Sequence, residues 1–274
     1  MERPKGARGG QPVSVVVAGA TGWVGSSLVA AIMAAPDMRL AGAVARRAAG
    51  MDVGTALGRA PVGVTIVPTI AEALAEPGWV LVDFTAAASV RAHVLAAVER
   101  GAHVVVGTSG LDPADDASLD ALAQSRGVGV VVAGNFSLVA TLAKRLALLA
   151  AAEMPGWELV DYAAAGKPDA PSGTAYEWAH ALAPHAAAPA VAAQDVVGDS
   201  RARGATIGGV QVHSLRVPGY VLSTALLAGS GDERLTIQYD AGPSPAPYLA
   251  GTLLAIRRVE GFRGLVRGLE HLLP

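Results

Sequence analysis

The stretch Gly19-Ala20-Thr21-Gly22-Trp23-Val24-Gly25 decides how the first half of the chain folds. It follows the apolar run Val13–Ala18, which is typical of a strand, and leads into the helical pattern Gly22–Ala35. In such a turn the first glycine allows the tight bend, the second lets the backbone approach a pyrophosphate, and the third lets the helix pack closely on the strand. The amides at the start of the helix attract an anion. We therefore predict that this turn binds the phosphates of a dinucleotide; the alternative is a tight turn without a ligand.

Outward from this turn, short apolar strands alternate with longer helical patterns. The strands are continuously apolar, which is typical of parallel strands covered on both faces. This alternation predicts an α/β fold with a Rossmann-type, doubly wound parallel sheet. We assign residues 13–134 to this dinucleotide-binding domain and expect a C-terminal helix, residues 243–274, to complete it. The strands expected in it are Val13–Ala18, Leu40–Ala45, Val64–Val67, Val80–Phe84, His103–Gly107 and Val128–Ala133.

The pattern changes after Asn135, and residues 135–242 are expected to form a second, α+β domain for substrate binding and oligomerisation. Two helical patterns, Leu138–Ala152 and Thr174–Ala183, lie among runs that are separated by turns rich in glycine and proline. Successive strands with such turns predict a mainly antiparallel sheet. The strands expected in it are Glu158–Tyr162, Gly208–Arg216, Tyr220–Ala228 and Glu233–Tyr239.

The end of the second expected strand indicates which cofactor binds. A site for NAD places Asp or Glu about twenty residues beyond the last glycine of the turn, against the ribose hydroxyls. This chain has Arg46 and Arg47 there. Two guanidinium groups suit a 2′-phosphate, so we predict NADPH, with NADH possible. The alternative is that both arginines lie on a solvated surface.

Composition excludes several classes of protein. A chain of 274 residues suggests about two domains at roughly 150 residues each. A formal net charge of −2 argues against nucleic acid or an anionic membrane as a partner, and the lack of cysteine excludes disulfides and thiolate chemistry. The six histidines lack metal-ligand spacing, so no metal is predicted. Glycines interrupt the one apolar stretch near the N-terminus, so we expect neither export nor a membrane anchor. We therefore expect a cytoplasmic protein with a small-molecule substrate, and we interpret Met1–Pro12 as a short leader.

A second motif is Lys167-Pro168-Asp169-Ala170-Pro171-Ser172-Gly173-Thr174-Ala175. Here the chain resembles the 4-hydroxy-tetrahydrodipicolinate reductase family, also called dihydrodipicolinate reductases, which has a lysine followed by D-A-P-S-G-T-A at this spacing. The resemblance runs from Val13 to about Arg258. Supporting segments in the family's order are Asp83-Phe84-Thr85, Gly107-Thr108-Ser109-Gly110, Asn135-Phe136-Ser137, Gly209–Arg216 and Glu233–Ile237.

The resemblance implies a role for each motif. Lys167 would be a proton donor, and the turn formed by Ser172, Gly173 and Thr174 would bind a substrate carboxylate. A Ser-Gly-Thr turn that enters a helix does offer hydroxyls and amides to an anion, although an ordinary helix cap is the alternative. The resemblance also implies a homotetramer formed through the sheet of the second domain. Together with Arg47, which the end of the second strand suggested, the predicted cofactor-binding residues are Gly19, Ala20, Thr21, Gly22, Trp23, Val24, Gly25, Arg46, Gly107, Thr108, Ser109, Gly134, Asn135 and Phe136.

The chain departs from the family just before the lysine. It has Ala163-Ala164-Ala165-Gly166 where the family has His-His-Arg-His, of which the first histidine is catalytic and the second binds substrate. Losing one positioned acid–base group costs about 10²–10⁴ in rate. The segment Tyr239–Pro243 also stands where the family has His-x-Ala and then arginine. Tyr162 is a candidate for the missing proton donor, and His213, in the family-like segment, is either structural or directed at the site.

This departure leaves several functions open. Our main prediction is an NADPH-dependent reductase of a different cyclic imine, enamine or related conjugated substrate that bears a carboxylate, belonging to specialised metabolism. One alternative is the genuine 4-hydroxy-tetrahydrodipicolinate reductase of lysine biosynthesis. Another is a nucleotide-binding cyclase, isomerase or regulatory protein without hydride transfer. A short-chain dehydrogenase does not fit, because Tyr162 and Lys167 are five residues apart in a loop rich in glycine and proline.

Overall fold

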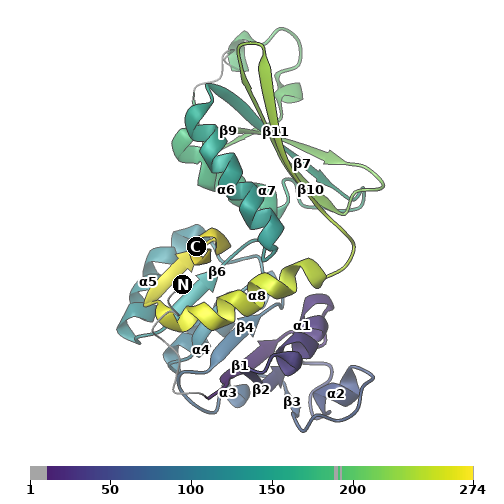
Figure 1. The fold of residues 1–274 in the computed structure, drawn as a ribbon, viewed down its shortest axis with the longest axis vertical. Helices are drawn as coiled ribbons and strands as arrows, with labels where there is room; N and C mark the ends of the chain where they lie inside the picture. Colours follow the sequence, from purple (N-terminus) through teal and green to yellow (C-terminus); the bar gives the residue numbers. More distant parts are fainter. Residues whose placement is uncertain (1–10, 188–190, 192, 274) are drawn as a thin grey trace. The chain divides into compact units, whose positions relative to one another are not determined.

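The computed structural model of the chain describes residues 11–187, 191 and 193–273 (Figure 1). The expected leader falls outside them except for its last two residues. The chain divides into two compact units. One runs as far as Leu138 and resumes at Pro245, and the other spans Val139–Ser244. Each unit has its own sheet and its own core, so each is described separately.

The first unit contains a seven-stranded sheet in the order β12-β6-β5-β4-β1-β2-β3, with every neighbouring pair parallel. Successive strands run outward in opposite directions from β1 and β4, so the order reverses between these two strands. In an open α/β sheet that reversal marks the crevice where a ligand binds, beyond the carboxyl ends of the strands. The strands are β1 Val13–Ala18, β2 Met38–Val44, β3 Ile66–Val67, β4 Val80–Asp83, β5 His103–Val106, β6 Gly129–Val132 and β12 Gly264–Arg267.

Helices cover both faces of this sheet, which explains why its strands are apolar throughout (Figure 1). Along β1, Val15 and Val17 pack in one core cluster with α1 and α8, whereas Val16 and Ala18 pack in the other with α4 and α5. None of the described helices in the chain is both long and apolar enough to cross a bilayer. The helices of this unit are α1 Trp23–Ala34, α2 Val53–Ala56, α3 Ile70–Ala73, α4 Ala87–Glu99, α5 Asp116–Ser125 and α8 Ala246–Arg258, with short 3-10 turns at Pro113–Asp115, Val259–Gly261 and Leu269–Leu272.

The C-terminal segment is not the single helix that we expected over residues 243–274. Helix α8 ends at Arg258, and β12 then adds a seventh strand beside β6. The helix cannot continue through Gly264, whose φ is +99°. The Leu265 amide donates to Asp120 Oδ1 at 2.7 Å, and Arg267 Nε donates to Asp116 Oδ2 at 2.7 Å, so α5 fixes the strand.

The second unit contains a five-stranded sheet in the order β11-β10-β7-β9-β8. Three of its pairings are antiparallel and one, β7 with β9, is parallel. The expected strand Gly208–Arg216 is instead part of a hairpin, because Gly208 and Gly209 turn the chain at φ +59° and +86°. The strands are β7 Gly156–Ala163, β8 Ala205–Ile207, β9 Val210–Arg216, β10 Leu222–Ser230 and β11 Glu233–Ala241.

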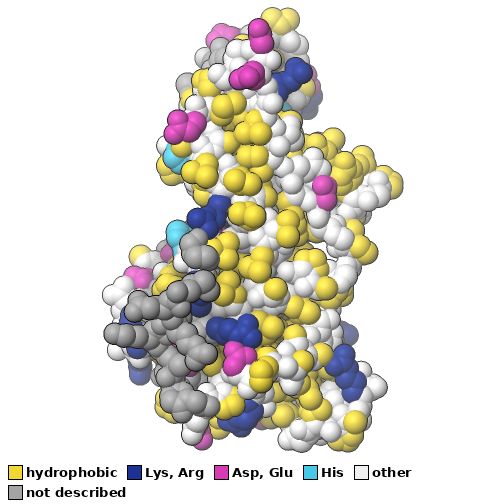
Figure 2. Space-filling view, in the orientation of Figure 1, with side chains coloured by type: hydrophobic (Ala, Val, Ile, Leu, Met, Phe, Trp, Pro, Cys, Tyr) yellow, Lys and Arg dark blue, Asp and Glu magenta, His cyan; other side chains and the backbone are white. Residues whose placement is uncertain are grey.

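Helices α6, Leu138–Glu153, and α7, Gly173–Leu182, share a core with this sheet. Leu159 of β7 and Leu226 of β10 belong to that core together with Trp178 of α7. Helix α6 also keeps an apolar stripe exposed, and Figure 2 shows apolar side chains gathered where Figure 1 places this helix. Short 3-10 turns lie at Ala183–His185, Ala193–Asp195 and Ser200–Arg203. The stripe consists of Val139, Leu142, Leu146 and Leu149.

The register of this sheet places one row of polar side chains on a single face. Asp161 of β7 lies opposite Thr224 of β10 and Ser214 of β9, and Thr224 lies opposite Tyr239 of β11. Residues directly opposite each other in a sheet share a face, and so do residues two apart along a strand. The row therefore shares its face with Leu159, in the core below the helices.

Candidate functional site

The phosphate turn has the close backbone contacts that require glycine. Gly19 has φ +80°, and a Cβ atom there would lie 2.3 Å from the Phe84 carbonyl oxygen. A Cβ atom on Gly25 would lie 2.0 Å from the Gly19 carbonyl oxygen. Helix α1 begins at Trp23, and Gly22 caps it without a side-chain hydrogen bond. The first amides of α1 therefore point out of the helix without intrahelical acceptors, which fits a pyrophosphate group.

The two arginines predicted to choose the cofactor lie just beyond β2. Arg46 and Arg47 are both exposed. Neither guanidinium group has a carboxylate partner within the described part of the chain. Two guanidinium groups next to each other, with no acid beside them, fit a phosphate on the adenosine ribose.

Asp83 joins the loops that follow β4 and β5. Its carboxylate is fully buried, and Oδ1 accepts from the Thr85 amide at 3.0 Å, the Thr85 hydroxyl at 2.7 Å and the Thr108 hydroxyl at 2.6 Å. Oδ2 lies 2.7 Å from Nδ1 of His93 in α4. Burial by itself raises the pKa of Asp83, but the hydrogen bonds from His93, Thr108 and Thr85 outweigh it and lower the pKa. Asp83 is therefore an ionised carboxylate that holds the two loops together.

The rest of the predicted nicotinamide end packs around Phe84. A Cβ atom on Gly107 would lie 2.1 Å from the Phe84 ring, so glycine is required there as well. The ring meets Phe136 edge-on, with centroids 5.8 Å apart. Asn135 Oδ1 accepts from the Ser137 amide at 2.8 Å. Phe84 thus contacts the phosphate turn through its backbone and the other two loops through its ring.

In the second unit, the predicted carboxylate turn opens α7. Ser172 is the N-cap of this helix, and its hydroxyl accepts from the Ala175 amide at 3.3 Å. Ser172 and Thr174 are buried, whereas Gly173 is exposed. The structure thus shows the helix cap, and carboxylate binding by the same turn stays a prediction.

A buried ion pair supports that turn. Asp161 Oδ2 accepts from the Ser172 amide at 2.9 Å, from Arg216 Nη2 at 2.8 Å and from the Ser214 hydroxyl at 3.2 Å. Arg216 Nη2 also donates to the Asp169 carbonyl oxygen at 2.5 Å. The Oδ1 atom of Asp161 is buried without a hydrogen-bond partner among the described residues.

Lys167 lies in the loop between β7 and α7, with its side chain one-third exposed, and its Nζ atom is 2.6 Å from Asp169 Oδ1. Burial opposes ionisation of Asp169, but the hydrogen bond and charge of Lys167 lower the pKa of that carboxyl. Ala163, at the first histidine position of the family, is completely buried, and Ala164 is exposed. Neither alanine can donate a proton.

Two further predicted candidates lie on the opposite face of the sheet. Tyr162 alternates with Asp161 along β7, and its ring stacks on Tyr220 with centroids 4.9 Å apart. Tyr162 thus lies on the face opposite Asp161 and the Ser172 turn, and its role as a replacement proton donor stays a prediction. His213 lies opposite Val160, and its Nε2 atom is 2.7 Å from Glu158 Oε2, which supports a structural role.

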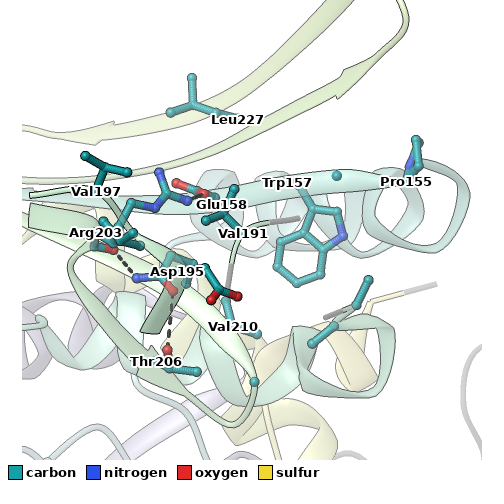
Figure 3. A pocket seen from close by; sticks show the side chains of 16 residues that line it. Pro155, Trp157, Glu158, Val191, Asp195, Val197, Arg203, Thr206, Val210 and Leu227 are labelled. Atoms are coloured by element: carbon teal, nitrogen blue, oxygen red, sulfur yellow. Dashed lines mark hydrogen bonds and ion pairs between the residues drawn. The ribbon is translucent and has the colours of Figure 1, made fainter. Parts of the chain in front are cut away.

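The second unit also has a pocket of about 880 Å³, away from the predicted site residues. Trp157 and Glu158 of β7 lie on one side of it, and Leu227 of β10 lies beyond them (Figure 3). Arg203 forms an ion pair with Glu158, and both Arg203 and Thr206 are hydrogen-bonded to Gln211 (Figure 3). None of the described residues that line it comes from the Lys167 loop or the Ser172 turn.

Sequence reasoning did not assign roles to Asp83, His93, Asp161 or Arg216. Asp83, Asp161 and Arg216 lie in or beside quoted motifs, and the only signal was a charged residue within an apolar run. His93 had no signal apart from its position ten residues after Asp83, which brings it back over the sheet on α4.

Known proteins resemble the chain over its whole length. Family models described as dihydrodipicolinate reductase, N-terminus and C-terminus, match residues 13–136 and 132–273. The 4-hydroxy-tetrahydrodipicolinate reductase of Moorella thermoacetica is 40% identical over 265 residues, covering 95% of this chain and 98% of that protein. The corresponding protein of Gloeobacter violaceus is 35% identical over 270 residues, covering 95% and 99%.

Solved structures agree. A dipicolinate-bound dihydrodipicolinate reductase from Paenisporosarcina sp. TG-14 superposes with a TM-score of 0.76 at 26% identity and covers 96% of this chain and 100% of that one. An amine dehydrogenase from Mycobacterium smegmatis, at 17% identity and a TM-score of 0.66, covers 97% of each chain and shares the fold. The predicted fold class, a Rossmann-type sheet with a second sheet domain, is confirmed.

Proposed function

The chain belongs to the dihydrodipicolinate reductase family of oxidoreductases, and from this premise we propose that it reduces 4-hydroxy-tetrahydrodipicolinate with NADPH. The observation that carries the proposal is full-length similarity to proteins of that name, which includes both cofactor and substrate units. It favours the lysine-pathway alternative over our main prediction of a reductase of specialised metabolism.

The residues of the first unit fit a nicotinamide dinucleotide. In the proposal, the turn Gly19–Gly25 holds the pyrophosphate, and Arg46 with Arg47 holds the 2′-phosphate. The loops Gly107–Ser109 and Gly134–Phe136 border the nicotinamide. NADPH supplies the hydride when it is bound, and the chain orients it there through loops that Asp83 fixes. Preference for NADPH over NADH rests on the two exposed arginines.

In the second unit, Ser172, Gly173 and Thr174 bind a substrate carboxylate through the start of α7. Reduction adds a hydride and a proton across one unsaturated bond, so the chain must provide a proton donor. Lys167 takes this role, because alanine occupies both family histidine positions just before it, at the end of β7 and in the loop that follows. Its ammonium group is partly exposed, so water can restore the proton after each turnover.

A related substrate is the second candidate, and the alanine segment Ala163–Ala165 is the observation that favours it. Without two imidazole groups the loop offers fewer donors to a dicarboxylate, which suits a cyclic imine or enamine with a single carboxylate. A non-redox protein would bind NADPH without transferring hydride to either compound.

Substitution of Lys167 tests the proposed chemistry. With 4-hydroxy-tetrahydrodipicolinate generated in the assay, we expect Lys167→Ala to lower kcat by about 10²–10⁴. Lys167→Arg keeps the charge but gives up a proton poorly, so it should restore KM more than kcat. NADPH affinity, measured by fluorescence titration, should be unchanged in both variants. Equal kcat in wild type and Lys167→Ala would contradict the role of Lys167.

We also propose that the chain forms a homotetramer through the second sheet and lies in the cytoplasm, as the resemblance implies. Leu215 and Leu227, on the sheet face opposite Asp161, are 40% and 43% exposed, which suits burial against another copy. Light scattering during size-exclusion chromatography should give about four times the mass of one chain. In the tetramer, Leu227→Asp should lower that mass.

A further inference from the structure

Asp161 is a buried negative charge next to a turn that the proposed function assigns to an anion. It is completely buried in β7 and lies one hydrogen bond from the Ser172 amide. An unpaired carboxylate in this position would repel a substrate carboxylate, and the low dielectric of the interior would strengthen that repulsion. A charge that opposes the ligand must therefore be compensated inside the unit.

Arg216 provides the compensation. Its side chain is 16% exposed, and Nη2 lies 2.8 Å from Asp161 Oδ2. The same nitrogen is 2.5 Å from the Asp169 carbonyl oxygen, two residues from Lys167. A planar guanidinium group can hold both acceptors in one fixed geometry, which an ammonium group does poorly. Arg216 thus connects β7 to the loop that carries Lys167.

Asp161 in turn fixes the beginning of α7. Its carboxylate accepts from the backbone amide of Ser172, and the Ser172 hydroxyl accepts from the Ala175 amide. The N-cap is therefore held from both sides, by its own amide and by its own hydroxyl. This leaves the exposed Gly173 in one orientation at the start of the helix.

We propose that Asp161 and Arg216 are a positioning pair for substrate binding. Asp161 sets the geometry of the Ser172–Thr174 turn, and Arg216 cancels the charge that Asp161 would otherwise present to the substrate. Neither residue touches the reacting atoms. This inference rests on the proposed function of the turn.

The alternative is that Arg216 binds the substrate carboxylate directly and that Asp161, by pairing with Arg216, only weakens this binding. The two accounts predict opposite signs for Asp161→Asn. Under the positioning account, the variant disturbs the Ser172 turn and weakens binding. Under direct binding by Arg216, it frees a guanidinium group and tightens binding or leaves it unchanged.

The experiment measures the Kd of dipicolinate, a stable dicarboxylate, by calorimetry, together with KM and kcat. We expect Asp161→Asn and Arg216→Lys each to raise the Kd and KM by about ten- to a hundredfold, because each disturbs a hydrogen bond to a charged group. The effect on kcat should be smaller. Ser214→Ala is the matched control, because it removes another hydrogen bond to Asp161 Oδ2 but leaves Ser172 in place, so it should change the Kd less than about threefold.

Two further measurements distinguish a folding defect from an effect on the position of the Ser172–Thr174 turn: a double variant and the affinity for NADPH. With Arg216→Met measured as a further single variant, Asp161→Asn combined with Arg216→Met should cost less than the sum of these two single changes, since the pair is removed as a unit. The affinity for NADPH, bound by the other unit, should stay constant in every variant. Unchanged or tighter dipicolinate binding by Asp161→Asn would overturn the positioning pair. A wild type that binds no dipicolinate and turns over no substrate would instead overturn the proposed function.

Discussion

Two buried aspartates, one in each unit, are satisfied to different degrees. Asp83 uses both oxygens: three hydrogen bonds reach Oδ1, and His93 pairs with Oδ2. Asp161 gathers three donors on Oδ2 and leaves Oδ1 buried without a partner among the described residues. Asp83 therefore uses both oxygens within its own unit, whereas Asp161 leaves one oxygen without a hydrogen bond among the described residues.

Asp161 Oδ1 is one of several buried polar atoms in this unit that lack a hydrogen bond among the described residues. The hydroxyls of Thr224 and Tyr239, in the same row as Asp161, are also buried without a partner in the described structure, and so is Arg216 Nε. Buried groups of this kind lower stability relative to apolar residues of the same shape. Folding alone does not explain why the two hydroxyls lie in one row across the sheet with Asp161. The comparison indicates that Asp83 stabilises the loops of the first unit, whereas the groups around Asp161 lower the stability of the second.

The largest effect should come from breaking the complete network. Asp83→Asn removes a buried carboxylate that takes part in four hydrogen bonds, and each buried group left unsatisfied costs about 1–3 kcal/mol. We expect a comparable fall in the free energy of unfolding, measured by urea titration. Asp115→Asn is the matched control: its partner Arg91 is also on α4, but that pair is exposed, so it should cost at most about 1 kcal/mol. Equal losses of stability in Asp83→Asn and Asp115→Asn would show that the buried network of Asp83 contributes no more than an exposed ion pair.

Acid should act on the same network. The lowered pKa of Asp83 means that the native protein binds fewer protons on this group than the unfolded chain does. Its contribution to stability is therefore complete above the unfolded pKa, near 4, and is lost as the pH falls through the native value. Below about pH 4, the free energy of unfolding should fall more steeply in wild type than in Asp83→Asn. Parallel curves would contradict the ionised state of Asp83.

A smaller effect is expected at the adenosine end of the cofactor unit. Arg46→Ala and Arg47→Ala should each raise the Kd for NADPH by about tenfold, the loss of one charged hydrogen bond, and leave the Kd for NADH unchanged. Arg59→Ala, an exposed arginine elsewhere in the unit, is the control. If NADPH and NADH lose affinity equally, the arginines do not recognise the 2′-phosphate.

The smallest effect should come from the unsatisfied row of the substrate unit. Tyr239→Phe removes a buried hydroxyl that has no partner in the described structure, so the free energy of unfolding should change by less than about 1 kcal/mol or rise. Tyr176→Phe, which removes a hydroxyl from a tyrosine that is 45% exposed, serves as the reference. A loss well above 1 kcal/mol would show that the Tyr239 hydroxyl forms a hydrogen bond in solution. The row around Asp161 would then be closer to Asp83 in how completely its polar groups are hydrogen-bonded.

Local patterns predicted the fold well because they depend on neighbouring residues. The glycine spacing of Gly19–Gly25 specified its turn, and continuous apolar runs specified a sheet covered on both faces. Strand β12 escaped prediction because it lies in a segment that was expected to be helical and because its partner, β6, is more than a hundred residues earlier. The alternation along β7 places Tyr162 on the face opposite Asp161, which the sequence reading of Tyr162 as a donor did not take into account.

The sequence predicted the local motifs of the candidate site but not the long-range hydrogen bonds that connect them. Ser172 capping α7 follows from a local string, but its support by Asp161 and Arg216 joins residues that are 55 positions apart. Thr108 reaches Asp83 across 25 positions. Such pairings depend on which strands become neighbours, and residue spacing along one sequence does not contain that information.

The most direct test of the proposed function compares two substrates. NADPH oxidation by the wild type should be followed with 4-hydroxy-tetrahydrodipicolinate and with a cyclic imine that carries a single carboxylate. The account predicts turnover of the dicarboxylate at ordinary enzyme rates, roughly 1–10³ s⁻¹, with kcat/KM at least about tenfold higher than for the monocarboxylate. A preference for the monocarboxylate, or no oxidation of NADPH by a sample that binds it, would contradict the account.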